Sequence, residues 1–292
     1  RPSAPSAAEL LAGFNERSDF DYIELLNTSG RHVDLAGASF VAGIEFVFEE
    51  DNPLRVLAPG ERVLLVKNRA GFEFRYGSGF PIAGEFTNNL SNDGEQLILL
   101  DAAQGTLVDL TYNDAGAWPG SADGDGYSLV LIDPMAPNDP ASWRSSVSVG
   151  GSPGSSDATS YGAWKLANGI TDDQSDDDAD GIEAILEYAI GGDPGMPSNH
   201  LLPTGAMEVI QVDFVTADYL VLSVRRRTGA DDLRTVVETS GDLGTWMADS
   251  VFLGSVNNGD GTETLRFRTS EPATSTLREF ARGRFTVIPG NP

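Results

Sequence analysis

The sequence lacks cysteine altogether and has only two histidines, His32 and His200, among its 292 residues. Without cysteine the chain can form neither disulfides nor thiolate zinc sites, and it has no cysteine nucleophile. Two histidines leave little material for a histidine-based metal site or an acid–base relay. No apolar run approaches the ~18 residues that a membrane-spanning helix needs. We therefore expect no membrane insertion.

The first residues of the chain lack an initiator methionine and the apolar stretch of a signal peptide. We therefore expect the chain to be processed, or to be the tail of a longer secreted parent.

Acidic residues far outnumber basic ones and give the chain a formal net charge of −25. A nucleic-acid-binding surface needs cations that neutralise phosphates, so this balance argues against DNA or RNA as a partner. The hydrophobic share of 40% is enough to form buried cores, and the length is typical of two domains.

Short alternating stretches separated by turn residues predict an all-β fold. Ile44, Phe46 and Phe48 alternate with Glu45, Val47 and Glu49, which is the period of a half-buried strand. Turn clusters such as 58–61 and 123–126 separate such stretches. About eight strands at this spacing predict an N-terminal β-sandwich over residues 1–157, preceded by a helix near residues 6–14.

The composition changes after residues 145–158, which are rich in serine and glycine and have the character of a flexible linker. Residues 158–198 predict a helix, an acidic loop and a second helix. Alternation returns in residues 199–292, where Leu220, Leu222 and Val224 share one face, and predicts a second, smaller β-sandwich.

Residues 176–187 fit the calcium-loop pattern of three alternating acidic residues, a glycine at position 6 and a glutamate at position 12. The first three acids lie on one side of a tight turn, where their hard oxygens suit Ca²⁺ better than a transition metal. The predicted ligands are Asp176, Asp178, Asp180, the main-chain carbonyl of Ile182, and Glu187. The alternative is an acidic, solvated linker without a metal.

A single EF-hand-like loop between two β domains predicts a structural calcium site rather than a sensor. Extracellular calcium modules bind with a Kd of roughly 10⁻⁴–10⁻³ M, so such a site would be filled outside a cell. The ion would then hold the two flanking helices in place.

Arginines cluster in the last region, at Arg225–Arg227, at Arg266 and Arg268, and at Arg282 and Arg284. Arg266 and Arg268 flank the apolar Phe267 and so share the face opposite it. On adjacent strands they could bind an anionic polysaccharide. The alternative, which we favour, is that the arginines of the cluster pair across strands with acids such as Glu238 and Glu263.

No residue set predicts catalysis. Residues 150–154 match the G-x-S-x-G pattern of a nucleophile elbow, but Pro153 cannot supply the backbone N–H that the oxyanion hole needs. We therefore expect no enzymatic activity and assign no catalytic residue.

Several stretches of residues 19–157 resemble the bacterial lamin-tail domain, an immunoglobulin-like β-sandwich. They are Phe20–Asn27, Val33–Gly37, Leu57–Glu61, Leu90–Glu95, Trp118–Pro119, Asp123–Leu129 and Gly151–Gly154. The resemblance implies an immunoglobulin-like fold for the first domain.

Residues 176–194 and 237–246 resemble the calcium-loop linker and the C-terminal β module of large secreted proteins of verrucomicrobial and planctomycete type. In such proteins a lamin-tail domain often follows a catalytic part, such as a spore-coat CotH-type kinase. The resemblance implies secretion, an accessory role, and the same calcium ligands. One departure is Ala179, which stands where a glycine is common.

Together these observations predict a secreted, non-catalytic accessory or structural protein, stabilised by calcium, that serves cell-surface adhesion, display or assembly. One alternative is a carbohydrate-binding module for an anionic polysaccharide. Another is the subunit of an extracellular filament that assembles through an unpaired sheet edge. The expected partners are a cell-surface glycan or other copies of the chain.

Overall fold

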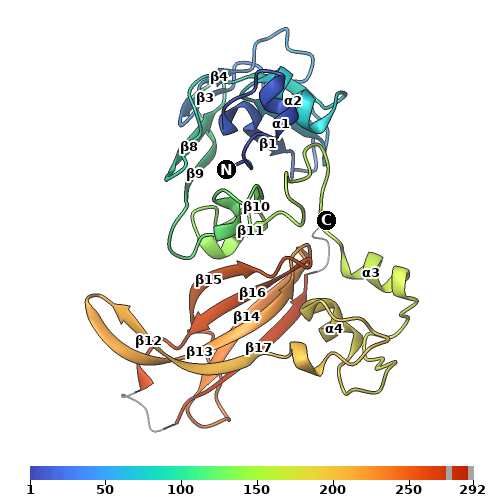
Figure 1. The fold of residues 1–292 in the computed structure, drawn as a ribbon, viewed down its shortest axis with the longest axis vertical. Helices are drawn as coiled ribbons and strands as arrows, with labels where there is room; N and C mark the ends of the chain where they lie inside the picture. Colours follow the sequence, from blue (N-terminus) through green and yellow to red (C-terminus); the bar gives the residue numbers. More distant parts are fainter. Residues whose placement is uncertain (274–277, 289–292) are drawn as a thin grey trace. The chain divides into compact units, whose positions relative to one another are not determined.

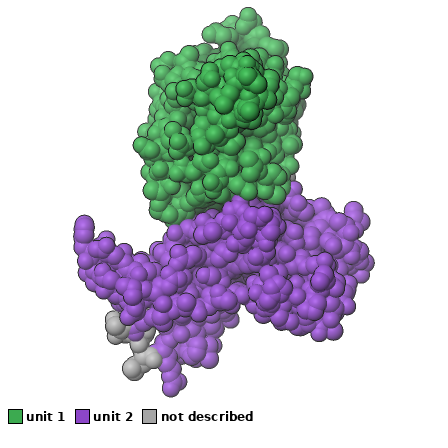
Figure 2. Space-filling model, viewed as in Figure 1, with its two compact units in different colours: residues 1–157 green, residues 158–292 purple. Residues whose placement is uncertain are grey.

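The computed structural model describes residues 1–273 and 278–288 (Figure 1). The chain divides into two compact units, residues 1–157 and 158–292, which Figure 2 shows in different colours. Strands make up 36% of the described residues and helices 15%, and the sheets are mainly antiparallel, so the predicted all-β fold is confirmed. None of the described helices has the length and apolar character that crossing a membrane requires.

The first unit is built on two sheets. One has the strand order β1-β6-β7, in which β6 and β7 run parallel, and the other has the order β4-β3-β8-β9. The strand pairs β2-β5 and β10-β11 complete the unit. The strands are β1 Tyr22–Leu26, β2 Val33–Asp34, β3 Ser39–Ala42, β4 Phe46–Val47, β5 Val56–Leu57, β6 Arg62–Val66, β7 Ile82–Glu85, β8 Gly94–Leu100, β9 Thr106–Asn113, β10 Leu129–Leu131 and β11 Trp143–Ser145.

Strand β6 is buried on both faces because its side chains alternate between two clusters. Val63 and Leu65 pack in the main core with residues of the second sheet, including Phe40 of β3 and Leu99 of β8. Leu64 and Val66 point the other way, into a smaller cluster with Phe72 and Ile82. Phe72 belongs to helix α2, Arg69–Tyr76, which the sequence analysis did not predict.

The other helical segments of the first unit are short. Helix α1, Ala7–Leu11, falls within the predicted range and begins with a capping box between Ser6 and Glu9. The 3₁₀ turns are η1 Arg17–Phe20, η2 Gly120–Ala122 and η3 Pro140–Ser142.

The expectation of a flexible linker at residues 145–158 is wrong, because residues 145–157 are packed into the first unit. Ser146 is fully buried, and Asp157 forms an ion pair of 2.6 Å with the buried Arg144. The Gly154 N–H donates a hydrogen bond of 2.6 Å to Glu24. The glycines of this segment permit close packing rather than flexibility.

The second unit contains a four-stranded sheet in the order β12-β13-β16-β15 and a two-stranded sheet, β14-β17. Leu222 and Val224 of β13 pack against Val237 of β14 and Phe285 of β17, so the two sheets share a core. The strands are β12 Thr204–Val212, β13 Val215–Arg227, β14 Leu233–Ser240, β15 Val251–Asn257, β16 Thr262–Arg268 and β17 Phe280–Val287.

Helices α3, Tyr161–Asn168, and α4, Ala184–Ile190, belong to this second unit and are followed by the 3₁₀ turn η4, Asn199–Leu201. Both α helices end at a glycine in the left-handed conformation, Gly169 and Gly191. The predicted helix–loop–helix segment is therefore part of the second unit, and the acidic loop lies between α3 and α4.

Candidate metal centre

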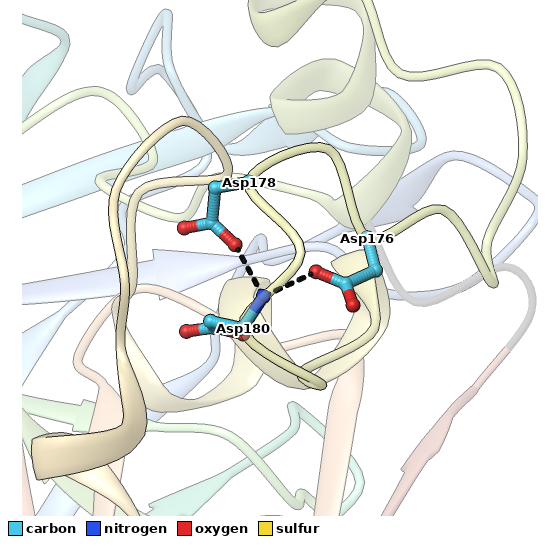
Figure 3. Close-up of side chains that lie close together, drawn as sticks. All are labelled: Asp176, Asp178 and Asp180. Atoms are coloured by element: carbon cyan, nitrogen blue, oxygen red, sulfur yellow. Dashed lines mark hydrogen bonds between the residues drawn. The ribbon is translucent and has the colours of Figure 1, made fainter.

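Three carboxylates of the acidic loop converge, as Figure 3 shows. Asp176, Asp178 and Asp180 each offer an oxygen within 4.8 Å of the others. The Asp180 N–H donates hydrogen bonds of 3.0 Å to Asp176 Oδ1 and 3.1 Å to Asp178 Oδ1. These bonds fold the loop so that the three acids at alternating positions face a common centre.

The loop backbone needs two residues in the left-handed region. Gly181 has a φ of 89° and Ala179 a φ of 61°. The Gly181 N–H donates 2.9 Å to Asp176 Oδ2, which closes the turn. A Cβ at Gly181 would meet nothing within 4 Å, so backbone conformation rather than space favours glycine here. The alanine at position 179 takes the bend without removing a carboxylate.

Glu187 lies in the first turn of α4 and is only 2% exposed. Its Oε1 has no hydrogen-bond partner among the described residues, and neither has the buried Oδ2 of Asp178. Glu187 lies outside the group of three aspartates that meet within 4.8 Å. Two buried carboxylate oxygens beside the loop therefore lack the partners that burial normally requires.

The electrostatics of the loop reflect this crowding of negative charge. Burial raises the pKa of Glu187 to about 7; the Ser198 hydroxyl opposes the rise, while the charges of Asp178, Asp180 and Asp193 add to it. Desolvation and the charges of Asp180 and Asp176 also raise the pKa of Asp178. A bound cation would reverse both effects, because it favours the ionised carboxylates.

Asp180 also ties the loop to the segment that follows α4. Its Oδ1 accepts a hydrogen bond of 2.8 Å from the Ile182 N–H, and its Oδ2 accepts one of 2.5 Å from the Ser198 N–H. Asn199 donates 3.1 Å to the Asp180 carbonyl. Ile182 itself is buried, with only 3% of its surface exposed. Sequence reasoning did not identify Ser198 or Asn199, which carry no motif.

Two arginines of β13 fix α4 on the sheet. Arg227 Nε donates 3.0 Å to the Tyr188 carbonyl, and Arg225 Nε donates 3.2 Å to the Ile190 carbonyl. Both carbonyls lie in the last turn of the helix, and that of Tyr188 also accepts a hydrogen bond of 3.4 Å from the Gly191 N–H. The helix that carries Glu187 is therefore held by the sheet.

The two arginines that sequence analysis proposed for glycan binding are both engaged. Arg266 forms an ion pair of 2.5 Å with Glu208. Arg268 donates 2.8 Å to the Thr269 carbonyl and lies 4.7 Å from the centre of the Tyr219 ring. The structure places them on one face of β16, as alternation predicts, but each already has a partner.

The alternative prediction, that arginines of the cluster pair across strands with Glu238 and Glu263, is confirmed. Glu263 forms a buried ion pair of 2.5 Å with Arg226. Glu238 pairs with both Arg282, at 2.8 Å, and Arg284, at 3.1 Å. Which acid pairs with which arginine depends on the register of the strands, and the sequence analysis did not predict that register.

Comparison of the chain with known proteins finds no matching family, no matching curated protein and no matching solved structure. The lamin-tail resemblance of the first unit therefore stays a prediction.

Proposed function

We propose that the acidic loop of the second unit binds one Ca²⁺ ion. The proposed ligands are the carboxylates of Asp176, Asp178, Asp180 and Glu187 and the Ile182 carbonyl. The observation that carries the proposal is the pair of buried carboxylate oxygens without partners, Asp178 Oδ2 and Glu187 Oε1, beside the converging aspartates. Several hard oxygens without nitrogen or sulfur suit Ca²⁺.

The ion would act by joining two parts of the unit. Asp176, Asp178 and Asp180 belong to the loop, whereas Glu187 belongs to α4, which Arg225 and Arg227 hold on β13. A cation shared by both would fix the loop to the helix and hence to the sheet. This supports a structural role, in which calcium stabilises the fold and takes part in no reaction.

We infer from this role that the chain is a secreted, non-catalytic accessory or structural module for adhesion, display or assembly at a cell surface. A weak structural site is filled where calcium reaches millimolar concentration, which is the extracellular condition. Stability that depends on calcium would then keep the module folded outside the cell.

Assembly through a sheet edge is a second candidate, favoured by β12. This strand lies at the edge of the four-stranded sheet and carries one charged side chain, Glu208, which Arg266 neutralises. Met207 and Val209 are exposed on the strand. Natural edge strands are often protected by lysine, proline or a bulge. Concentration-dependent sedimentation, abolished by Val209→Lys, would support this candidate.

Calcium titration of the full chain tests the first proposal. Isothermal titration should give one site, and the thermal unfolding of the second unit should shift upward with calcium but not with equal magnesium. At a hundredfold excess over Kd, the expected gain in the free energy of unfolding is about 2.7 kcal/mol.

Variants of neighbouring loop residues provide the matched comparison. Asp180→Asn should remove binding, whereas Asp177→Asn, an exposed acid of the same loop outside the group of three, should retain it. Equal loss in both variants would show that calcium responds to total loop charge and not to a built site. An unchanged unfolding temperature in calcium would contradict the structural role.

A further inference from the structure

Three arginines lie on the outer face of the two-stranded sheet. Strands β14 and β17 pair so that Glu238 lies opposite Arg282, Val236 opposite Arg284, and Arg234 opposite Thr286. Because side chains alternate between faces, these residues share one face, and Val237 and Phe285 point to the core on the other. We call Arg234, Arg282 and Arg284, with Glu238, the arginine face.

The arginine face carries more positive charge than it neutralises. Arg282 and Arg284 share the single carboxylate of Glu238, at 2.8 and 3.1 Å. Arg234 is exposed, and its side chain makes no hydrogen bond or ion pair among the described residues. The side chains of Arg282 and Arg284 remain 47% and 56% exposed. The arginine face therefore contains three guanidinium groups and one carboxylate.

Other arginines of the second unit contrast with this arrangement. Arg225 pairs with Asp260 and Arg226 with Glu263, each through its own carboxylate. Arg266 likewise has Glu208 to itself. In a chain with a net charge of −25, a sheet face on which arginines outnumber carboxylates is a local exception.

Two side chains of the arginine face, Arg282 and Arg284, are held in place by Glu238 before any ligand arrives. Glu238 is largely buried and accepts a hydrogen bond of 2.9 Å from Arg282 Nε. The Arg282 guanidinium also lies 4.1 Å from the centre of the half-buried Trp246 ring. A fixed guanidinium loses less entropy on binding, and its planar fork matches a carboxylate.

We propose that the arginine face binds an acidic oligosaccharide through its carboxylates. The exposed Thr286 hydroxyl and the indole of Trp246 border the guanidinium groups and supply the hydrogen bonding and flat apolar surface that a sugar uses. The negative charge of the rest of the chain opposes dense polyanions, so the face suits widely spaced carboxylates. This binding uses no residue of the acidic loop and is independent of the calcium proposal.

Calorimetric titration of the full chain with a tetrasaccharide of galacturonic acid, at low salt, tests the proposal. We expect binding to the wild type and a loss of affinity of about tenfold for Arg284→Gln, because one charge-assisted contact disappears. Arg234→Gln should weaken binding to a similar extent, and the double variant should bind too weakly to measure. Arg266→Gln, on β16, is the matched control and should bind as the wild type does.

Two further ligands separate sugar recognition from charge alone. A neutral galactose tetrasaccharide should not bind, and a tetraglutamate peptide should bind at least tenfold more weakly than the acidic sugar. Absence of wild-type binding, equal binding of the peptide, or full binding by the double variant would each overturn the proposal. Self-association that Arg234→Gln and Arg284→Gln abolish without sugar would also overturn it, because the partner would be a second copy. Unchanged unfolding temperatures establish that the variants are folded.

Discussion

The Tyr188 hydroxyl donates a hydrogen bond of 2.5 Å to the carboxylate of Asp232, 44 residues further along the chain. The other oxygen of Asp232 accepts 2.6 Å from the Tyr161 N–H, at the start of α3. One buried carboxylate thus joins both helices that flank the acidic loop to the beginning of β14. Burial and the charge of Asp232 raise the pKa of Tyr188, so the hydroxyl keeps its proton.

Tyr188→Phe should destabilise the second unit by about 1–3 kcal/mol, because it removes a donor from a buried carboxylate. Urea unfolding followed by tryptophan fluorescence measures this, since Trp164 lies 5.6 Å from the Tyr188 ring. Tyr127→Phe makes the same chemical change at a hydroxyl without a hydrogen bond among the described residues and should leave stability unchanged. Equal stability of both variants would contradict the assigned role of Asp232.

Glu187→Gln should have opposite effects with and without calcium. Without the ion, the substitution removes a buried charge whose Oε1 has no partner, so stability should stay level or rise. With the ion, the variant should lose the gain that calcium gives the wild type, about 2.7 kcal/mol at a hundredfold excess over Kd. Thermal unfolding of both proteins in calcium and in chelator measures the two effects. A variant destabilised equally in both conditions would show that Glu187 serves the core and not the ion.

The sequence supports the prediction of the acidic loop because its geometry is local. Asp176, Asp178 and Asp180 converge because their spacing and the bend at Gly181 bring them together within six residues. The Ser198 N–H donates a hydrogen bond to Asp180, which lies 18 residues earlier in the chain. No short sequence pattern predicts this contact. Local spacing therefore predicts the carboxylates but not the contacts that anchor them.

The arginines show where strand register limits sequence reasoning. Alternation correctly places Arg266 and Arg268 on one face of β16. Their partners depend on which residues β12 and β13 set beside them, and this register brings Glu208 to Arg266. The register of β14 with β17 places Arg282 and Arg284 near the same acid, Glu238, so that two arginines share one carboxylate. Pairing between strands that are distant in the sequence determines which arginines lack a carboxylate of their own. A short stretch of sequence does not contain this information.

Gly151→Ala should destabilise the first unit more than Gly60→Ala. Both glycines have a φ of +76°, so both substitutions carry the same conformational cost of about 1–2 kcal/mol. A Cβ at Gly60 meets nothing within 4 Å, whereas one at Gly151 would lie 2.2 Å from Tyr22 Oη and 2.3 Å from Ser128 Oγ. These two hydroxyls form a hydrogen bond of 2.9 Å that the methyl group would separate.

Urea unfolding of the two alanine variants measures the difference, which we expect to be about 1–3 kcal/mol beyond the cost at Gly60. An equal loss in the two variants would mean that residues 145–157 do not pack against the first unit as the structure describes. The comparison therefore tests packing of this segment separately from backbone conformation.

Stability of the first unit should fall in acid because of Glu9. This carboxylate is 6% exposed and accepts 2.7 and 3.0 Å hydrogen bonds from Arg75, whose guanidinium also lies 3.3 Å from the centre of the Phe20 ring. The hydrogen bond from Arg75 lowers the pKa of Glu9 to about 2, from an ordinary value of 4.5; burial opposes this, and Ser6 assists it. The ionised form is therefore favoured by folding.

Because the folded pKa lies below the unfolded one, this stabilisation is fully present above pH 4.5 and disappears as the pH falls toward 2. The whole effect amounts to at most about 3 kcal/mol. Glu9→Gln should be less stable than the wild type at neutral pH, and the gap in the free energy of unfolding should close between pH 4.5 and pH 2. Glu73→Gln breaks an exposed ion pair of 3.6 Å with Arg69 and should cost less than about 1 kcal/mol at any pH. A gap for Glu9→Gln that stays constant down to pH 2 would contradict the assigned link between Glu9 and Arg75.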